Sequence, residues 1–166
     1  MRNYKYRGLP YEDVDFDFID VHIKKDEFVY GNLIVDGDTA YIVHGIVECT
    51  DDNLQLEQWI RVRPETVGQF TGLKDKNGVE IYDGDIIQVV AHMVTLQGKP
   101  TKDEKSISTY KVFYHPKRCQ WFIERLTSNK GRTIGFQEEL NYIVSHYWEV
   151  IGNIHSGVSG SEKSTK

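Results

Sequence analysis

The segment from Thr66 to Val90 constrains the fold more than any other part of this chain, because turn residues and β-forming residues alternate through it. Asn77-Gly78 predicts a tight hairpin turn, since both residues adopt a positive φ at low cost. Gly84 marks a second turn one short strand later, and the apolar run that begins at Ile86 predicts another strand. These residues specify a β fold, and they do not form a reaction centre.

Runs of β-branched and aromatic residues separated by turn residues continue through most of the chain and predict many short strands. In the N-terminal part, the predicted strands are 5–8, 14–18, 28–35, 40–44 and 59–62, with a hairpin turn at 36–38 and a polar connector at 51–58. In the C-terminal part, the predicted strands are 81–82, 85–90, 108–115, 120–126 and 148–155. One short helix is predicted over 137–147, where Leu140, Ile143, Val144 and Tyr147 recur at helical spacing.

These elements predict a mainly β protein, either all-β or α+β with one short helix. Closing short strands into a barrel buries aromatic side chains and removes open edges. We therefore expect a small antiparallel SH3-like barrel in a C-terminal lobe, 64–155, packed with a smaller β-sheet in an N-terminal lobe, 1–63. The polar segment 92–106 predicts an exposed hairpin arm or a mobile loop, and the composition of 156–166 predicts a disordered tail.

Charge is distributed unevenly along a chain whose net charge is −5. Residues 1–57 hold 13 acidic and 5 basic residues, a net charge of −8, so the remaining residues carry a net charge of +3. No apolar run is long enough to span a membrane, and the N-terminus lacks the apolar region of a signal peptide. Cys49 and Cys119 lie far apart and belong to no C-x-x-C pair. We expect a cytoplasmic protein with free thiols and no membrane contact.

Catalytic motifs with workable spacing are absent from the sequence. The aspartates Asp75, Asp83 and Asp85 could bind magnesium or share a proton, but their place beside glycines also suits turn residues that bond backbone N–H groups. The six histidines fall at no metal-ligand spacing, and no nucleophile elbow or phosphate-binding loop occurs. We therefore expect no enzyme and no cofactor; a hydrolase with an unrecognised metal site remains an alternative.

One set of basic and aromatic residues fits a binding surface. Small β-barrels that hold single-stranded nucleic acid combine stacking rings with cations in this way. The rings could equally face the core, and the acidic total disfavours non-specific DNA binding. The candidate nucleic-acid or partner surface consists of Lys111, Lys117, Arg118, Trp121, Arg125, Lys130 and Arg132.

Three blocks of the chain carry a resemblance to a known family. The run E-T-V-G-Q-F-T-G-L-K-D-K-N-G-V-E-I-Y-D-G-D-I-I, the late V-I-G-N-I-H and the early K-Y-R-G with F-V-Y-G-N-L-I closely resemble the YopX family of phage and prophage proteins. The resemblance implies a mainly β, phage-encoded cytoplasmic protein of a bacterial host. It supplies no activity, cofactor or catalytic residue. This chain departs from the family pattern in an acidic insert at 9–26 and in the arm at 92–106.

Three functional hypotheses follow from the sequence. The first is a non-catalytic phage accessory protein that acts by contact with a host or phage protein, or with a second copy of itself. The aromatic composition supports it, because Tyr and Trp anchor interfaces, and the acidic insert could pair with the cationic strand ends. The second is a nucleic-acid-binding small β-barrel protein, which is not favoured. The third is the hydrolase with an unrecognised metal site.

Overall fold

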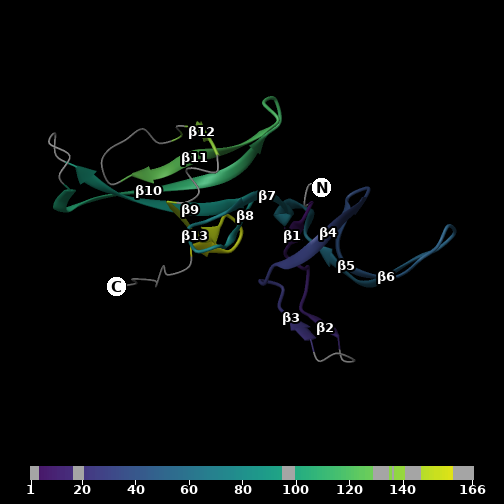
Figure 1. Cartoon of the computed structure of the whole chain (residues 1–166). Coiled ribbons are helices and arrows are strands. Elements are labelled where there is room, and N and C mark those ends of the chain that lie inside the picture. Colours follow the sequence, from purple (N-terminus) through teal and green to yellow (C-terminus); the bar gives the residue numbers. More distant parts are fainter. Residues whose placement is uncertain are drawn as a thin grey trace. The chain divides into compact units, whose positions relative to one another are not determined.

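The computed structural model describes residues 4–16, 21–94, 100–128, 135, 137–140 and 147–158. Over these residues the protein is mainly β, as predicted, and its helical content there is a single 3₁₀ turn at Pro64–Thr66. The chain divides into two compact units, Met1–Phe70 and Thr71–Lys166 (Figure 1). The division lies within strand β7, Gly68–Lys74, whereas the sequence placed a boundary between residues 63 and 64.

The first unit is an antiparallel sheet in the order β6-β5-β4-β1, with the start of β7 beside β1, and a separate β2-β3 hairpin. Its strands are β1 Tyr6–Gly8, β2 Val14–Phe16, β3 Val21–Ile23, β4 Val29–Asp36, β5 Thr39–Cys49 and β6 Leu54–Val62. The predicted turn between β4 and β5 is confirmed, because Asp36 pairs with Thr39 and Gly37 has a φ of 55°. Phe18, which the sequence placed in a strand with Val14 and Phe16, lies outside the described residues.

The core of the first unit lies on one face of this sheet. Its buried side chains are Val29, Ala40, Ile42, Ile60 and Val62. A Cβ added at Gly8 would lie 2.8 Å from a methyl group of Val62, so the backbone of β1 approaches the end of β6 closely. The fully buried Pro10 forms an isolated antiparallel bridge with Val62, and the N–H of Leu9 donates to Thr66 Oγ1 at 2.9 Å.

The second unit contains an antiparallel sheet in the order β12-β11-β10-β9-β13-β14 (Figure 1). The strands of that sheet are β9 Asp85–Val94, β10 Pro100–His115, β11 Gln120–Ser128, β12 Gln137–Glu139, β13 Trp148–Asn153 and β14 Gly157–Val158. The second unit also contains β8 Glu80–Tyr82, which follows β7 in the chain and is not part of this sheet. The arm predicted over 92–106 is a hairpin arm where it is described, because β9 and β10 pair out to Val94 and Pro100. Residues 95–99 lie outside the described residues. The prediction of mobility in this segment therefore stays a prediction.

The turns predicted in the central segment are confirmed. The φ angles of Gly78 and Gly84 are 83° and 81°, in the left-handed region that favours glycine. Asp75 organises the first turn: its Oδ1 accepts hydrogen bonds from Asn77 N–H at 2.8 Å and Val79 N–H at 2.9 Å. The backbone N–H of Gly78 also donates to Asp75 O at 3.0 Å. Asp75 is thus a turn residue.

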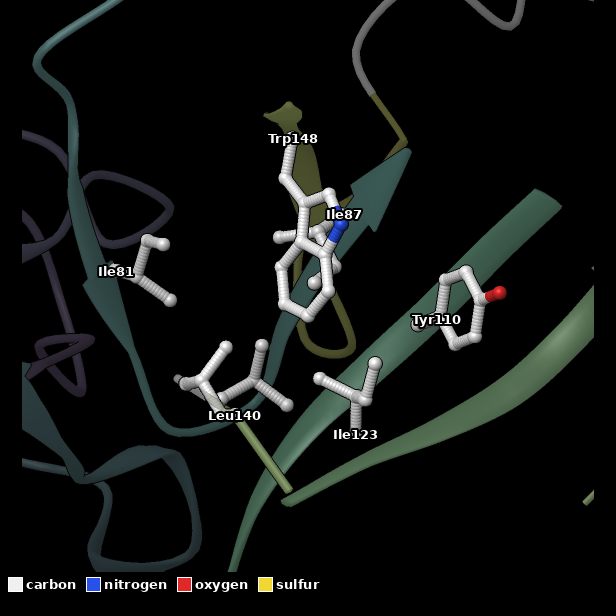
Figure 2. Close-up of a cluster of buried hydrophobic side chains, with 7 residues drawn as sticks. Ile81, Ile87, Tyr110, Ile123, Leu140 and Trp148 are labelled. Carbon is white, nitrogen blue, oxygen red and sulfur yellow. The ribbon is translucent and has the colours of Figure 1, made fainter. Parts of the chain in front are cut away.

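Large apolar side chains from several strands form the core of the second unit (Figure 2). The rings of Tyr110 on β10 and Trp148 on β13 stack with centroids 6.2 Å apart and an interplanar angle of 11°. Leu140 joins this cluster directly after β12, and its N–H donates to Trp121 O at 2.9 Å. The cluster comprises Ile81, Ile87, Tyr110, Val112, Ile123, Leu140 and Trp148.

The predicted SH3-like barrel is not confirmed. Among the described strands of the second unit, β12 and β14 are the two ends of an open order, and neither pairs with the other. Bulges provide strand curvature in place of closure, with register shifts between Thr109 and Tyr110 and between Val150 and Gly152. The sheet therefore keeps its edges open.

The predicted helix and tail also differ from the structure. Gln137–Glu139 form β12 and pair with β11, so the helix prediction is wrong for these residues, because pairing to a sheet edge overrides the local apolar spacing. Residues 141–146 lie outside the described residues. The predicted tail began at residue 156, but Gly157 and Val158 pair with β13 as β14. Residues 159–166 are not described.

The polar connector predicted over 51–58 is wrong as well. Strand β5 runs on to Cys49 and β6 begins at Leu54, so most of the expected connector is the outer half of a long hairpin. Leu54 and Leu56 alternate with Gln55 and Glu57, and this period of two is typical of a strand. The three acidic residues of the segment obscure that pattern when polarity alone is considered.

Candidate interaction surface

The structure does not bring the predicted basic and aromatic residues onto one face. In the β10-β11 pair, Lys111 lies opposite Glu124, whereas Tyr110 lies opposite Arg125 and Tyr114 opposite Trp121. Residues opposite each other share a face, and consecutive residues alternate between faces. Lys111 therefore lies on one face of this hairpin, and Trp121 and Arg125 lie on the other.

Arg125 is a buried residue of the second unit. Its side chain donates to the Tyr110 hydroxyl oxygen from Nε at 3.2 Å and from an Nη at 2.7 Å, and an Nη lies 3.8 Å from Glu138 Oε1. Trp121 is half-buried and packs against the same core cluster. These two residues serve the packing of the unit.

Two further members of the predicted surface lie in a turn. Lys117 and Arg118 belong to the turn between β10 and β11, and the Arg118 guanidinium carbon lies 5.2 Å from the centroid of the Phe122 ring. Lys130 and Arg132 lie outside the described residues. The described members thus form no single patch.

The candidate carboxylates form turn and core contacts. Asp85 is fully buried; its Oδ2 accepts from Tyr82 N–H at 2.7 Å, and its Oδ1 accepts from Asn153 Nδ2 at 3.4 Å. Asp75 bonds backbone N–H groups with both carboxylate oxygens. Within the described part of the chain, no three or more His, Cys, Asp or Glu side chains gather closely enough to hold a metal ion. The same part holds no helix long and apolar enough to cross a membrane.

The β5-β6 hairpin of the first unit extends beyond the strand next to it. The pairing of β4 with β5 ends at Asn32 and Val43, but β5 and β6 remain paired out to Cys49 and Leu54 (Figure 1). The outer half of the hairpin is therefore two-stranded in the described structure. Nearer the base, by contrast, β4 lies beside β5 as a third strand.

Apolar side chains are exposed along this outer half. Relative exposures are 64% for Ile46, 61% for Val47 and 55% for Leu54. Trp59, which lies opposite Val43 at the inner end of this half, is 61% exposed, whereas its neighbour Ile60 is 8% exposed. Several exposed apolar residues close together mark a contact surface more often than isolated apolar residues do. We call the group Ile46, Val47, Leu54, Leu56 and Trp59 the hairpin surface.

Two open concavities meet at Leu54 and Leu56. One, of about 470 Å³, is lined by Asn53, Gln55 and Trp59 in addition to these leucines, so it follows β6 alone. The other, of about 500 Å³, extends across the sheet from the same leucines to β4. The hairpin surface is therefore hollowed, and a partner could seat side chains in it.

The charge of the hairpin has one sign. Residues 44–58 contain Glu48, Asp51, Asp52 and Glu57 and no lysine or arginine. The Glu57 side chain lies across Gly45, whose φ is 69°, and a Cβ added at Gly45 would approach Glu57 Cβ to 2.8 Å. The Glu57 side chain thus lies against Gly45, on the face of β6 that carries Trp59. The surface joins apolar contact area to negative charge.

The described residues define a mainly β protein of two units, with an apolar, acidic hairpin in the first unit. The family model for YopX protein matches residues 23–158, and the chain belongs to the YopX family. No curated protein matches it. Among solved structures it is similar to protein EF1440 from Enterococcus faecalis, with 19% identity, a TM-score of 0.47, and coverage of 94% of this chain and 96% of that one.

Proposed function

We propose that this YopX-family protein is a non-catalytic interaction module that binds another protein through the hairpin surface. The observation that carries the proposal is the exposure of Ile46, Leu54 and Trp59 on a hairpin that extends past its neighbouring strand. Exposed residues of this kind contribute nothing to the core of the first unit. Burial of these side chains by a partner would remove apolar surface from water. This burial stabilises a complex by about 25 cal/mol per Å² of apolar surface.

The composition of the hairpin surface supports a protein partner. Tryptophan is strongly enriched among the residues that dominate binding energy, especially where apolar neighbours can exclude water around it. Trp59 lines one concavity together with Leu54 and Leu56, although its side chain projects from the opposite face of β6. The acidic residues of the hairpin would repel a phosphate backbone. A protein partner therefore suits this surface better than a nucleic acid does.

The family supplies the biological setting of the proposal. The resemblance to phage and prophage proteins supports an accessory role in a phage-infected or lysogenic bacterium, in the cytoplasm of the host. The partner would then be a host or phage protein, or a second copy of this chain. Binding of the partner at the hairpin surface would itself be the function, and no substrate would be converted.

The test compares two matched double variants in capture from nuclease-treated host lysate. Leu54→Thr/Trp59→Thr alters the hairpin surface while keeping side chains that favour strands. Val79→Thr/Tyr147→Thr alters two exposed apolar residues of the second unit, 48% and 70% exposed, and serves as the control. The captured protein is then purified and titrated against the wild-type protein and both variants.

We expect the purified partner to bind the wild-type protein and the control with equal affinity, and to bind the hairpin variant about tenfold or more weakly. Equal binding of the partner to all three proteins would refute the hairpin surface as the binding site. Capture that occurs only from lysate left without nuclease, together with a mobility shift of DNA or RNA by the wild-type protein, would establish nucleic-acid binding in place of the proposed function.

A further inference from the structure

We infer that the hairpin surface takes an extended peptide segment with alternating apolar and basic side chains, which adds to the sheet as a strand beside β6. This inference rests on the proposed function and specifies the partner's chemistry and binding mode. Strand addition at an open sheet edge is a recurrent way of binding peptides, because backbone groups supply affinity and alternate side chains supply specificity.

The edge of β6 is open along most of its length. In the strand order of the described residues, β6 is the outermost strand, with β5 on its other side. The edge is closed at the base of β6, where Pro10 bridges Val62. The neighbouring Arg61 makes a side-chain contact only, with its guanidinium carbon 4.8 Å from the centroid of the Tyr11 ring. Over Leu54–Arg61 the described structure shows no strand beyond this edge, so outward N–H and C=O groups there are available to a partner.

The two faces of β6 call for different side chains. Leu54 and Leu56 lie on one face, while Glu57 and Trp59 lie on the other, since consecutive residues of a strand alternate. Neighbouring strands pair side chains on the same face. A partner strand would therefore place apolar side chains beside the leucines and cationic side chains beside the carboxylate and the indole ring, which attract cations in complementary ways.

The charge of the hairpin disfavours a second copy as the occupant. Each hairpin carries four carboxylates between residues 44 and 58 and no lysine or arginine in that interval. A face-matched antiparallel pairing of two β6 edges centred on Glu57 would place the two Glu57 residues directly opposite each other, and like charges in that position are destabilising. A basic segment removes this repulsion, so we commit to a heterologous cationic strand.

Four synthetic peptides test the inference on the full-length protein by titration calorimetry. The first is an octapeptide that alternates valine and lysine, matching the free length of β6. The second replaces every lysine with glutamate. The third and fourth are valine–lysine peptides with N-methyl groups on alternate amides, in the two opposite phases. In a strand, alternate N–H groups point to opposite edges, so only one phase removes the donors that face β6.

We expect the valine–lysine peptide to bind and the glutamate peptide to bind roughly tenfold or more weakly. One N-methyl phase should abolish binding and the other should preserve it. Glu57→Gln should weaken the lysine peptide several-fold, and raising the ionic strength should do the same for the wild-type protein. Equal binding of the two N-methyl phases, or of the lysine and glutamate peptides, would overturn the inference.

The two proposals fail in different ways. If the purified natural partner loses affinity for Leu54→Thr/Trp59→Thr but the two N-methyl phases bind equally, the hairpin surface is a binding site and strand addition is wrong. If the peptides behave as expected but the natural partner binds the hairpin variant unchanged, the strand edge is real and the proposed function is wrong.

Discussion

The carboxylate of Asp75 accepts a hydrogen bond from the backbone N–H of Val150, with Oδ2 and N 3.0 Å apart and 75 residues of chain between them. The same residue closes its own turn with Oδ1. A second contact fixes the same pair of elements, because the N–H of Lys76 donates to Trp148 O at 3.0 Å. The β7-β8 turn is thus bonded to β13 within the second unit.

Replacing Asp75 should destabilise the protein strongly. The side chain is 6% exposed and accepts three backbone N–H groups, so Asp75→Ala leaves several donors without a partner. We expect a loss of about 3 kcal/mol or more in the free energy of unfolding, since bonds to charged groups contribute about 1.5–3 kcal/mol each. Urea unfolding measures this loss. Asp51→Ala, at an exposed position, is the control and should change stability by less than about 0.5 kcal/mol; equal effects would contradict the role of Asp75.

The two glycines with similar positive φ should differ in their response to alanine. No atom lies within 4 Å of a Cβ added at Gly78, so Gly78→Ala should cost only the backbone strain, about 1–2 kcal/mol. A Cβ at Gly84 would lie 3.3 Å from Asn153 Nδ2 and from Ile154 Cγ1, so Gly84→Ala should cost more. Gly78→Asn is the matched control, because asparagine tolerates this conformation. Equal losses at the two glycines would count against the packing of the second turn on β13.

The hydroxyl of Tyr110 should matter to stability independently of its ring. Tyr110→Phe keeps the ring stacked on Trp148 but removes the acceptor of two Arg125 hydrogen bonds, which leaves a buried cation short of partners. We expect a loss of about 1.5–3 kcal/mol in the free energy of unfolding. Lys111→Ala, on the other face of the same strand, should have little effect. A thermal or urea unfolding series would reveal the contrast; equal effects of the two substitutions would show that Arg125 does not depend on Tyr110.

Local turn chemistry is the part of this fold that the sequence predicts best. Asn77-Gly78 and Gly84 reverse the chain within a few residues, so their conformations depend on those residues alone. The bond from Val150 to Asp75 joins residues distant in sequence, and no local pattern indicates it. The open sheet could not be predicted for the same reason. Closure into a barrel requires pairing between strands that are distant in the sequence, and local residue patterns do not indicate such pairing.

The candidate surface shows the same division between local and non-local information. The alternation of Leu54 and Leu56 with polar residues is readable as a strand, although the acidic residues around it favoured a connector. Alternation along β6 explains why Trp59 is exposed beside the buried Ile60, but which of the two faces the core depends on the packing of the first unit, which no local pattern indicates. Arg125 presents the converse case, since its burial depends on a partner, Tyr110, that only the β10-β11 register brings opposite it.

The last prediction concerns the contribution of the hairpin surface to the free energy of unfolding of the protein without a partner. Ile46→Thr and Trp59→Thr each remove apolar atoms that are mostly in contact with water, at 64% and 61% exposure, and threonine retains the strand preference. We expect each to change the free energy of unfolding by less than about 0.5 kcal/mol. Ile60→Ala, in the same strand but 8% exposed, should cost about 2–5 kcal/mol because it opens a cavity in the core of the first unit.

Urea unfolding of the three variants at one protein concentration gives the comparison. A loss of several kcal/mol for Ile46→Thr or Trp59→Thr would mean that these side chains stabilise the isolated chain, and the argument that they are kept for a partner would fail. Stability unchanged in the two threonine variants, together with weaker binding of the purified partner by Leu54→Thr/Trp59→Thr, would separate the two roles. The hairpin surface would then contribute to binding while Ile60 and its neighbours contribute to folding, on adjacent residues of one strand.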